Sequence, residues 1–332
     1  MILIVSEPGD VHAQQVGEQL DVLGAAHRLL DLREFPCDGT VSMRFEPQAS
    51  WSGSLHPARG SAIALHEVGA VWWRRPQGLQ VATQLTDESY RLFALGETDE
   101  MFGGLWPSLD AFWVNDPKSD EVAHKKPYQL KLAQAVGLQL PRTLMTSCPD
   151  EARAFLDGLG PGRTVYKCFS ATYQHWRETR LLTEEEARDL SAVRLCPVIF
   201  QEYVPASVDV RVTVVGDSVF AAAIHSREGD YPVDFRMNLD AIRITPHTLP
   251  QPVWLALRAL LDRLGLFYGA ADFRLTPEGR YVFLEVNPAG QWLFVEDATG
   301  QPIARTLAAT LAHEARARAG CRDDRPRGRV KR

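Results

Sequence analysis

Apolar residues fall into short blocks along the first hundred positions, and their spacing predicts alternating strands and helices. Residues 1–5 form a wholly apolar run typical of a buried strand, and apolar residues at helical spacing follow over 11–23. Two further apolar runs, 27–32 and 70–73, also predict buried strands. These residues therefore indicate an open α/β layer, although 38–68 show no clear period and receive no assignment.

The next segment predicts a long helix, a short strand and then a second helix. Helical spacing runs over 87–105, and a strand-like run over 111–114 must stop before Pro117. Ser119 can cap a helix that continues to Val136, where a glycine follows. The stop at Pro117 also predicts a domain boundary near this point.

Strand and helix patterns alternate through the rest of the chain. Strands are expected over 164–169, 198–204, 268–275 and 280–286, and helices over 183–190, from the proline-rich stretch 246–252 to 264, and over 302–315. Two β-branched runs between 210 and 224 flank Gly216-Asp217, which is a hairpin signal. A turn over 276–279 joins the last two strands. The Arg-rich remainder is typical of a mobile tail.

Size and composition indicate a globular chain of two or three domains with a cleft between them. The 332 residues are 45% hydrophobic and 23% charged, which excludes disordered, collagen-like and coiled-coil classes. No apolar run approaches the roughly 18 residues of a membrane span, and no basic segment precedes the first apolar run. We therefore expect a cytoplasmic protein with no membrane partner. The five cysteines are an odd number without a CxxC pair, so we expect them to be reduced.

The distribution of charge argues against a nucleic-acid partner. From Glu314 onward, eight basic and three acidic residues contribute +5 to a total of −6, which leaves about −11 on the body of the chain. The sequence also contains no GxSxG, HExxH, GxxxxGK[ST] or GxGxxG motif. Hydrolase, zinc protease, P-loop and Rossmann classes therefore lack their signatures.

Oxygen-bearing side chains gather on the predicted terminal hairpin. Glu285 and Asn287 lie two residues apart on one strand and so share a face, and Asp272 lies on the partner strand. If Asp272 pairs with Glu285, the midpoint between them lies about one residue from the centre of the predicted turn, which is close enough to place these side chains together on one face of the sheet. Because both strands are otherwise apolar, inward carboxylates there need a cation, and this oxygen set suits Mg²⁺. The alternative is a solvated sheet face with ordinary charges.

Several short motifs resemble those of one enzyme superfamily. Glu285-Val286-Asn287-Pro288 resembles the metal-binding signature of ATP-grasp ligases, and the following Gly290-Gln291-Trp292 is similar to the branch that modifies ribosomally made peptides, the graspetide (microviridin-type) maturases. Further similar pieces occur in the same order, namely Val71-Trp72-Trp73-Arg74-Arg75-Pro76, Lys126-Pro127-Tyr128-Gln129-Leu130, Gly137-Leu138, Pro141-Arg142-Thr143, Gln201-Glu202-Tyr203-Val204 and Asp209-Val210-Arg211.

This resemblance implies an α/β ATP-grasp fold in which two α+β subdomains clasp ATP. The implied division is an N-terminal open α/β domain (pre-ATP-grasp) over 1–117, a central subdomain over 118–197 and a C-terminal subdomain with the metal site over 198–315. A flexible Arg-rich tail over 316–332 would follow.

The resemblance also implies a nucleotide site. Lys126 and Lys167 would contact phosphates, and a lysine inside the apolar run 165–169 does need an anionic partner. Lys125 remains an alternative to Lys126. The run Gln201, Glu202, Tyr203 and Val204 would hold adenine, with Asp209 near the ribose. The other interpretation of that run is an exposed hinge that does not bind nucleotide.

Two arginines are implied at the reacting centre and two at the substrate. Arg211 and Arg236 would face the γ-phosphate, where a fixed guanidinium stabilises growing negative charge. Arg74 and Arg75 would contact the substrate. A flexible cover over the phosphates is expected at 170–180.

The implied activity is ADP-forming ligation through an acyl phosphate. The first hypothesis is a maturase that joins Asp or Glu side chains of a precursor peptide, with leader and core, to Ser, Thr or Lys, using ATP and two Mg²⁺ ions as a homodimer. The second is a ligase that adds an amino acid to a small molecule or protein terminus, like glutathione synthetase or the glutamate ligases. The third, a nucleotide-binding scaffold without turnover, is opposed by the set Asp272, Glu285 and Asn287.

Overall fold

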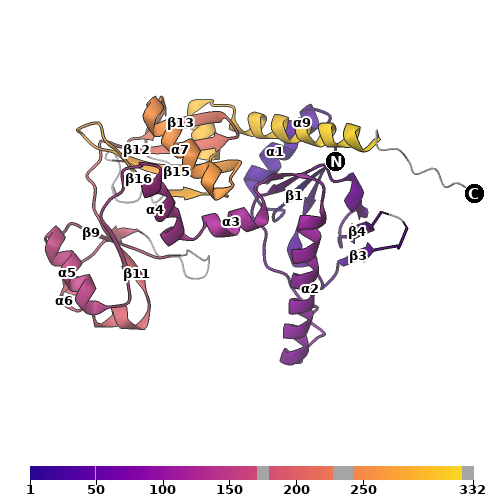
Figure 1. The fold of residues 1–332 in the computed structure, drawn as a ribbon, viewed down its shortest axis with the longest axis horizontal. Coiled ribbons are helices and arrows are strands. Elements are labelled where there is room, and N and C mark those ends of the chain that lie inside the picture. Colours follow the sequence, from indigo (N-terminus) through magenta and orange to yellow (C-terminus); the bar gives the residue numbers. More distant parts are fainter. Residues whose placement is uncertain (49, 170–178, 227–241, 324–332) are drawn as a thin grey trace, which may run out of the picture. The chain divides into compact units, whose positions relative to one another are not determined.

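The computed structural model describes residues 1–332 apart from 49, 170–178, 227–241 and 324–332 (Figure 1). Contacts divide the chain into two compact units, Met1–Pro117 with Pro302–Arg332, and Lys118–Gln301. In sequence, the second unit is therefore an insertion in the first. Among the described residues, no helix is both long and apolar enough to span a membrane. The cysteines described in that set are free thiols, namely Cys37, Cys148, Cys168 and Cys196.

A parallel sheet in the order β2-β1-β6-β7 forms the centre of the first unit. Its strands are β1 Ile2–Val5, β2 His27–Leu30, β6 Ala70–Trp73 and β7 Phe112–Val114. Every residue of β1 is buried, as expected for a parallel strand that is covered on both faces. The predicted open α/β layer is confirmed, and its strands lie where the apolar runs predicted them.

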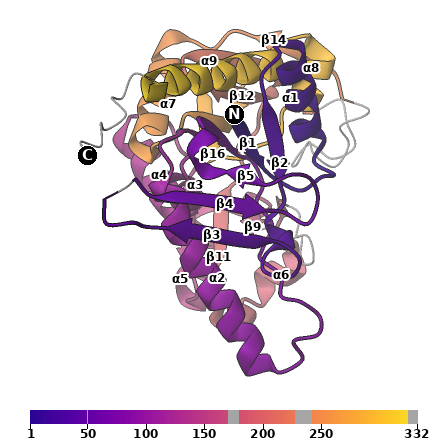
Figure 2. The ribbon, with the colours of Figure 1, turned by 90° about the vertical axis from the view of Figure 1, so that its right-hand side faces the viewer.

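Helices cover this sheet on both faces (Figure 2). Helix α1 (Val11–Val22) packs against α9 (Ile303–Asp323), which also contacts β1, β6 and β7. On the other face, apolar side chains of β1 and β6 share a core with Phe102, Leu105 and Trp106 of α2 (Glu88–Ser108). The helices predicted over 11–23 and 87–105 are thus confirmed.

The stretch that showed no period forms a small antiparallel sheet in the order β3-β4-β5. Its elements are β3 Thr40–Arg44, β4 Ser52–His56 and β5 Ile63–Ala64, and the flanking 3-10 turns are η1 Leu32–Glu34 and η2 Leu65–Glu67. Residues of β3 alternate only between half-buried and exposed. Such a strand carries a weak apolar signal, which explains why no element was assigned to these residues from their pattern.

Helix α9 is longer than predicted and belongs to the first unit. The sequence predicted a helix end at 315, a mobile tail from 316, and membership of the C-terminal subdomain. The described helix instead continues to Asp323, since alanine and arginine are strong helix formers and Arg318 pairs with Glu314 one turn earlier (2.6 Å). Its fully buried Leu307 and Leu311 explain why the helix packs on the sheet.

The second unit contains two antiparallel sheets, of which the first has the order β10-β9-β11-β8. Its strands are β8 Thr143–Thr146, β9 Thr164–Lys167, β10 Arg180–Leu181 and β11 Val198–Glu202. Helix α5 (Pro149–Leu159), α6 (Glu184–Arg188) and the 3-10 turn η3 (Ser191–Leu195) bring Leu156 and Val193 against Phe200. This small core packs the helices as one layer against the sheet.

The other sheet of the second unit has the order β14-β13-β12-β15-β16. Its strands are β12 Val208–Val215, β13 Ser218–Ile224, β14 Ile244–His247, β15 Tyr268–Leu275 and β16 Tyr281–Asn287, and α8 is Leu293–Thr299. Alternate residues of β12 and β15 share a core with α7 (Gln251–Leu264). The predicted hairpin at Gly216-Asp217 is confirmed, and Gly216 takes the left-handed φ of 57° that such a short loop needs.

The single helix predicted from Ser119 to Val136 is wrong, because the structure has two helices, α3 (Pro117–Ala123) and α4 (Lys126–Ala135). Proline at 127 has no N–H to bond the carbonyl of Ala123, and its ring disfavours helical backbone before it. Ser119 therefore lies inside α3 instead of capping the predicted helix.

Candidate nucleotide and metal site

Three charged side chains form one row across adjacent strands of the five-stranded sheet. Arg211 on β12 lies opposite Asp272 on β15, which lies opposite Glu285 on β16. Directly opposite residues share a face, so the row is a single surface feature of that sheet. The predicted pairing of Asp272 with Glu285 is confirmed, and a bulge between Asp272 and Phe273 absorbs the one-residue offset from the turn.

The guanidinium of Arg211 is held on two sides. Its Nη1 donates to both carboxylate oxygens of Asp272 at 2.8 Å, and its Nη2 donates to the carbonyl of Gln291 at 2.7 Å. The Arg211 side chain is only 7% exposed and the Asp272 side chain 15%. A buried charge pair needs such additional hydrogen bonds to offset desolvation. The sequence predicted both residues at the reacting centre, and the structure brings them together.

Lys126 and Asn287 complete the cluster. The Lys126 ammonium donates to the Glu285 carboxylate, and Asn287 Nδ2 lies 3.3 Å from Glu285 Oε1 and 3.4 Å from Asp272 Oδ2. Lys125 instead pairs with Glu121 on the exposed side of the helix (3.4 Å). Of the two alternatives left by the sequence, Lys126 is therefore the lysine that reaches the carboxylates.

A glycine lets the following loop close over this cluster. A Cβ on Gly290 would lie 2.4 Å from the Ala270 Cβ, 3.0 Å from Arg211 Nη2 and 3.2 Å from the Asn287 Cβ. The carbonyl of Gly290 accepts a hydrogen bond from the Tyr268 hydroxyl at 2.7 Å. No larger residue fits between these neighbours, which gives a physical reason for Gly290 in the motif that the sequence flagged only by resemblance.

The run predicted to hold adenine lies at the end of β11. Gln201 is buried and donates to the Thr143 hydroxyl at 3.0 Å. Glu202 is half-buried, with its carboxylate 3.9 Å from Arg163 Nη2. The Tyr203 ring packs under the guanidinium of Arg274 at 5.4 Å. This run is thus anchored from several sides and is not a loose hinge.

Arg274 links that run to the strand that carries Asp209, and sequence reasoning missed it. Its Nε donates to Asp209 Oδ1 at 2.8 Å, and its Nη1 donates to the Val204 carbonyl at 3.0 Å. Burial alone would lower the pKa of Arg274, but the Asp209 carboxylate raises it above its ordinary value. No spacing rule in the sequence connects residues 65 positions apart, so only the fold reveals this arginine.

The other predicted residues are more dispersed. Lys167 ends β9 opposite Ile199 and is half-buried. Arg236 and most of the cover predicted at 170–180 lie outside the described residues. In the first unit, Arg74 is 1% exposed and pairs with Asp10 at 3.0 Å, whereas Arg75 is exposed. Of the two arginines assigned to substrate, only Arg75 therefore presents its side chain to solvent.

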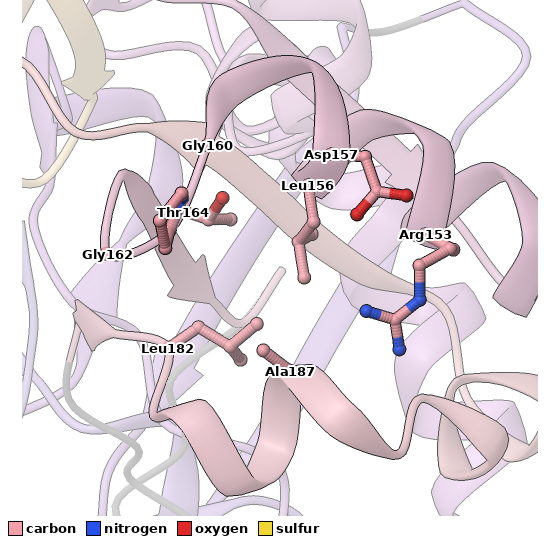
Figure 3. A pocket seen from close by; sticks show the side chains of 9 residues that line it. Arg153, Leu156, Asp157, Gly160, Gly162, Thr164, Leu182 and Ala187 are labelled. Carbon is pink, nitrogen blue, oxygen red and sulfur yellow. The ribbon is translucent and has the colours of Figure 1, made fainter.

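Two hollows in the second unit lie apart from this cluster. One of about 320 Å³ is bordered by Arg153 and Asp157 of α5, with Leu156, Leu182 and Ala187 around it (Figure 3). The other, of about 340 Å³, lies along β13, β14 and α7. Neither of these two hollows is lined by a residue of the charged row, so it is the chemistry of the row that marks the candidate site.

Comparison with known families decides the superfamily. The MvdD pre-ATP grasp domain family matches residues 1–121, and the RimK-like ATP-grasp domain family matches 123–311. The chain belongs to the RimK-like ATP-grasp family. The fold predicted from the resemblance is thereby confirmed, with the charged row on the ATP-grasp part of the chain.

Three solved structures resemble this ATP-grasp chain over nearly its whole length. Macrocyclase MdnC from Microcystis aeruginosa MRC, bound with precursor peptide MdnA, is 28% identical, with 94% of this chain and 99% of that chain covered and a TM-score of 0.82. A RiPP-associated ATP-grasp ligase from Chryseobacterium gregarium, in complex with ADP and a leader and core peptide, is 27% identical, with 94% of this chain and 96% of that chain covered and a TM-score of 0.84. ATP-grasp ligase PsnB, complexed with minimal precursor, Mg and ADP, is 26% identical, with 95% of this chain and 97% of that chain covered and a TM-score of 0.73.

Curated relatives of this ATP-grasp chain align with it over a smaller share of their length. A probable alpha-L-glutamate ligase from Pseudoalteromonas translucida (strain TAC 125) is 27% identical over 204 residues. That alignment covers 59% of this chain and 65% of the relative, so the chain spans less than two thirds of the relative's length.

Proposed function

We propose that this chain is an ADP-forming carboxylate ligase that acts on a ribosomally made precursor peptide. It phosphorylates Asp or Glu side chains with ATP and joins them to Ser, Thr or Lys side chains of the same peptide as ω-esters or ω-amides. The observation that carries the proposal is the row Arg211, Asp272 and Glu285, extended by Lys126 and Asn287, on a fold whose solved relatives were crystallised with ADP and peptide.

The residues of the cluster fit a divalent cation. Asp272 and Glu285 provide carboxylate oxygens, and a half-turn of the Asn287 amide presents its oxygen beside them. Oxygen ligands of this kind suit Mg²⁺, which when bound neutralises charge on the transferred phosphoryl group. A solved relative contains Mg and ADP. The resemblance implies two ions, and a Mn²⁺ titration of the ADP complex measures their number.

Side chains of α4 and of both sheets of the second unit have separate tasks in the proposed reaction. Lys126 and Lys167 bind phosphates, the run from Gln201 to Val204 holds adenine, and Arg211 faces the γ-phosphate. Asp209 near the ribose has the least structural support, because its carboxylate is buried against Arg274. Arg236 is proposed beside Arg211, and Arg75 is proposed at the peptide.

The reaction needs no protein nucleophile. A peptide carboxylate oxygen attacks the γ-phosphorus, the bond from that phosphorus to the β-γ bridging oxygen breaks, and ADP leaves. A Ser or Thr hydroxyl or the Lys amine then attacks the acyl carbon, the bond to the phosphate oxygen breaks, and phosphate leaves as the nucleophile loses its proton. Arg211, fixed by Asp272 and Gln291, contributes a preorganised positive charge to the first step.

The test is incubation of the chain with ATP, Mg²⁺ and a candidate precursor peptide rich in Thr, Ser, Asp and Glu. We expect the peptide to lose one water per crosslink while ADP and phosphate appear in equal amounts. With glutamate added to the same mixture, a mass gain of one amino-acid residue, that is the free amino acid less one water, would instead support the glutamate-ligase alternative, which the curated relatives favour. If the chain binds ADP but releases no phosphate from ATP under any of these conditions, the nucleotide-binding scaffold without turnover is the remaining hypothesis. Sedimentation of the same preparation tests the implied homodimer.

A further inference from the structure

The break between α3 and α4 leaves a carbonyl that a side chain satisfies. In a continuous helix the Ala123 carbonyl would accept from residue 127, but proline there has no N–H. Gln129 Nε2 donates to this carbonyl instead, at 2.9 Å. Gln129 is 2% exposed, so its amide has no exchange with water and must find its partners inside the protein.

The same amide pairs with both backbone groups of one residue on β16. Gln129 Nε2 donates to the Val286 carbonyl at 2.7 Å, and Gln129 Oε1 accepts from the Val286 N–H at 2.9 Å. Strand β16 lies at the edge of its sheet, and among the described residues only a single bridge from Gln139 reaches its outer side, at Val282 and Phe283. The Gln129 amide thus takes the place of one residue of a further strand.

Val286 is the residue between two proposed metal ligands. Its side chain is buried in the apolar core, so Glu285 and Asn287, one position to either side, point to the opposite face. Lys126, which pairs with Glu285, lies one helical turn before Gln129 on α4. One amide therefore joins the helix that provides the cation to the strand that provides two oxygen ligands.

We propose that Gln129 is a positioning residue that sets the spacing between Lys126 and the metal ligands Glu285 and Asn287. The inference rests on the function proposed above. Gln129 itself contacts neither nucleotide nor substrate in this proposal. Residues that orient metal ligands commonly change metal affinity by about 10-fold to 100-fold when removed, and we place Gln129 in that class.

The test uses Mn²⁺ as a probe for the protein loaded with ADP, with Mn²⁺ affinity measured by electron paramagnetic resonance. Gln129→Met removes all three hydrogen bonds at similar volume, and we expect about 10-fold weaker Mn²⁺ binding. Gln129→Glu keeps an acceptor for the Val286 N–H but sets a carboxyl oxygen against the carbonyls of Ala123 and Val286, and we expect a loss at least as large. In steady-state kinetics, we expect both Gln129 variants to raise the KM for Mg·ATP by a larger factor than they lower kcat.

The matched control is Leu156→Ala in the separate small core of α5. It should lower Tm, and we expect its Mn²⁺ affinity to stay within about twofold of wild type, since a cavity in another core leaves the ligands in place. If Gln129→Met or, should that variant not fold, Gln129→Glu binds Mn²⁺ as tightly as wild type, Gln129 has no positioning role and the proposed function stands. If wild type with ADP binds no Mn²⁺, the proposed function fails first.

Discussion

One ion pair from each unit can be compared by how completely water is excluded, since Arg74–Asp10 is buried and Lys126–Glu285 is partly exposed. In the first unit, the side chains of Arg74 and Asp10 are 1% and 5% exposed. In the second unit, Lys126 and Glu285 are 23% and 22% exposed. A sealed pair cannot exchange partners without unfolding its surroundings, whereas a partly open pair can release each group to a ligand. Of these two pairs, only the more exposed one can give up its partner to a ligand without local unfolding; Arg211 with Asp272, at 7% and 15% exposed, lies between them.

The sealed pair also serves a helix terminus. Asp10 caps α1 by accepting from the His12 N–H at 2.9 Å, and its other oxygen accepts from the Ser6 hydroxyl at 2.8 Å. Burial alone would raise the pKa of the Asp10 carboxyl, but the hydrogen bonds from His12 and the charge of Arg74 hold it well below its ordinary range. This network therefore stabilises the end of the sheet in its ionised form.

The largest effect is expected from Glu285→Ala, which removes one carboxylate from the open cluster. Turnover with ATP and Mg²⁺ should fall by about 10³-fold or more, since the metal and Lys126 both lose their anchor. Thermal unfolding should change little, because the pair is partly exposed. The control is Glu278→Ala in the exposed turn of the same hairpin. Full activity in Glu285→Ala would remove the metal assignment.

Arg74→Ala breaks the sealed pair and should act on stability. It leaves the Asp10 carboxylate buried without its cation, which costs about 3 to 5 kcal/mol in free energy of unfolding. Urea denaturation measures the loss, and nucleotide affinity of the remaining folded protein should be unchanged. Arg75→Ala, at the neighbouring exposed position, is the matched control and should change the free energy by less than about 0.5 kcal/mol. A loss below about 1 kcal/mol in Arg74→Ala would contradict the comparison.

Lys126→Met should separate nucleotide from metal. We expect ATP affinity to fall by about 10-fold to 100-fold, and Mn²⁺ without nucleotide to bind more tightly, because Glu285 no longer has the ammonium as its partner. Isothermal titration measures both. Lys125→Met, one residue earlier and paired with Glu121, is the control. A larger loss in Lys125→Met would show that the wrong lysine has been placed at the phosphates.

The smallest effect concerns a third, exposed pair, Arg180 with Glu186. Hydrogen bonds from Arg180 lower the pKa of Glu186 from 4.5 to about 2. A folded-state pKa below the unfolded value means stability that is present above pH 4.5 and is lost as the pH falls toward 2. Because these side chains are 29% and 40% exposed, we expect less than about 1 kcal/mol. The free-energy gap between wild type and Glu186→Gln should shrink from pH 7 to pH 3.

Glu184→Gln in the same helical turn is the control for that pH series, since the Glu184 side chain is 90% exposed. Its effect on the free energy of unfolding should be near zero at both pH values. An equal gap for Glu186→Gln at pH 7 and pH 3 would show that its pKa is not lowered in the folded state.

Local patterns in the sequence predicted most of the elements and the core of the candidate site. The turn at 276–279 placed Asp272 within about one residue of Glu285, and the bulge beside Asp272 shifts the register toward this pairing. Burial on both faces made the parallel strands visible as continuous apolar runs. Lys126 and Arg211 came from resemblance, and the structure added their carboxylate partners.

Contacts between distant segments could not be predicted in the same way. Gln129 and Val286 are 157 positions apart, and Arg274 and Asp209 are 65 apart, so no periodicity relates them. The break between α3 and α4 depended on one proline whose effect the helical spacing concealed. Helix α9 carried an ordinary amphipathic pattern that does not say which sheet it covers.

The split of the first unit across the sequence has a consequence for synthesis. Strand β1 is made before Lys118–Gln301, whereas α9, which covers it, is made after the whole of that unit. In a nascent chain, the apolar strand β1 therefore stays uncovered while the inserted unit folds. Folding of that unit brings its two ends closer together, which lowers the entropy cost of docking α9 on the sheet. We expect released chains truncated at residue 301 to resist protease in the inserted unit while being cut within the first.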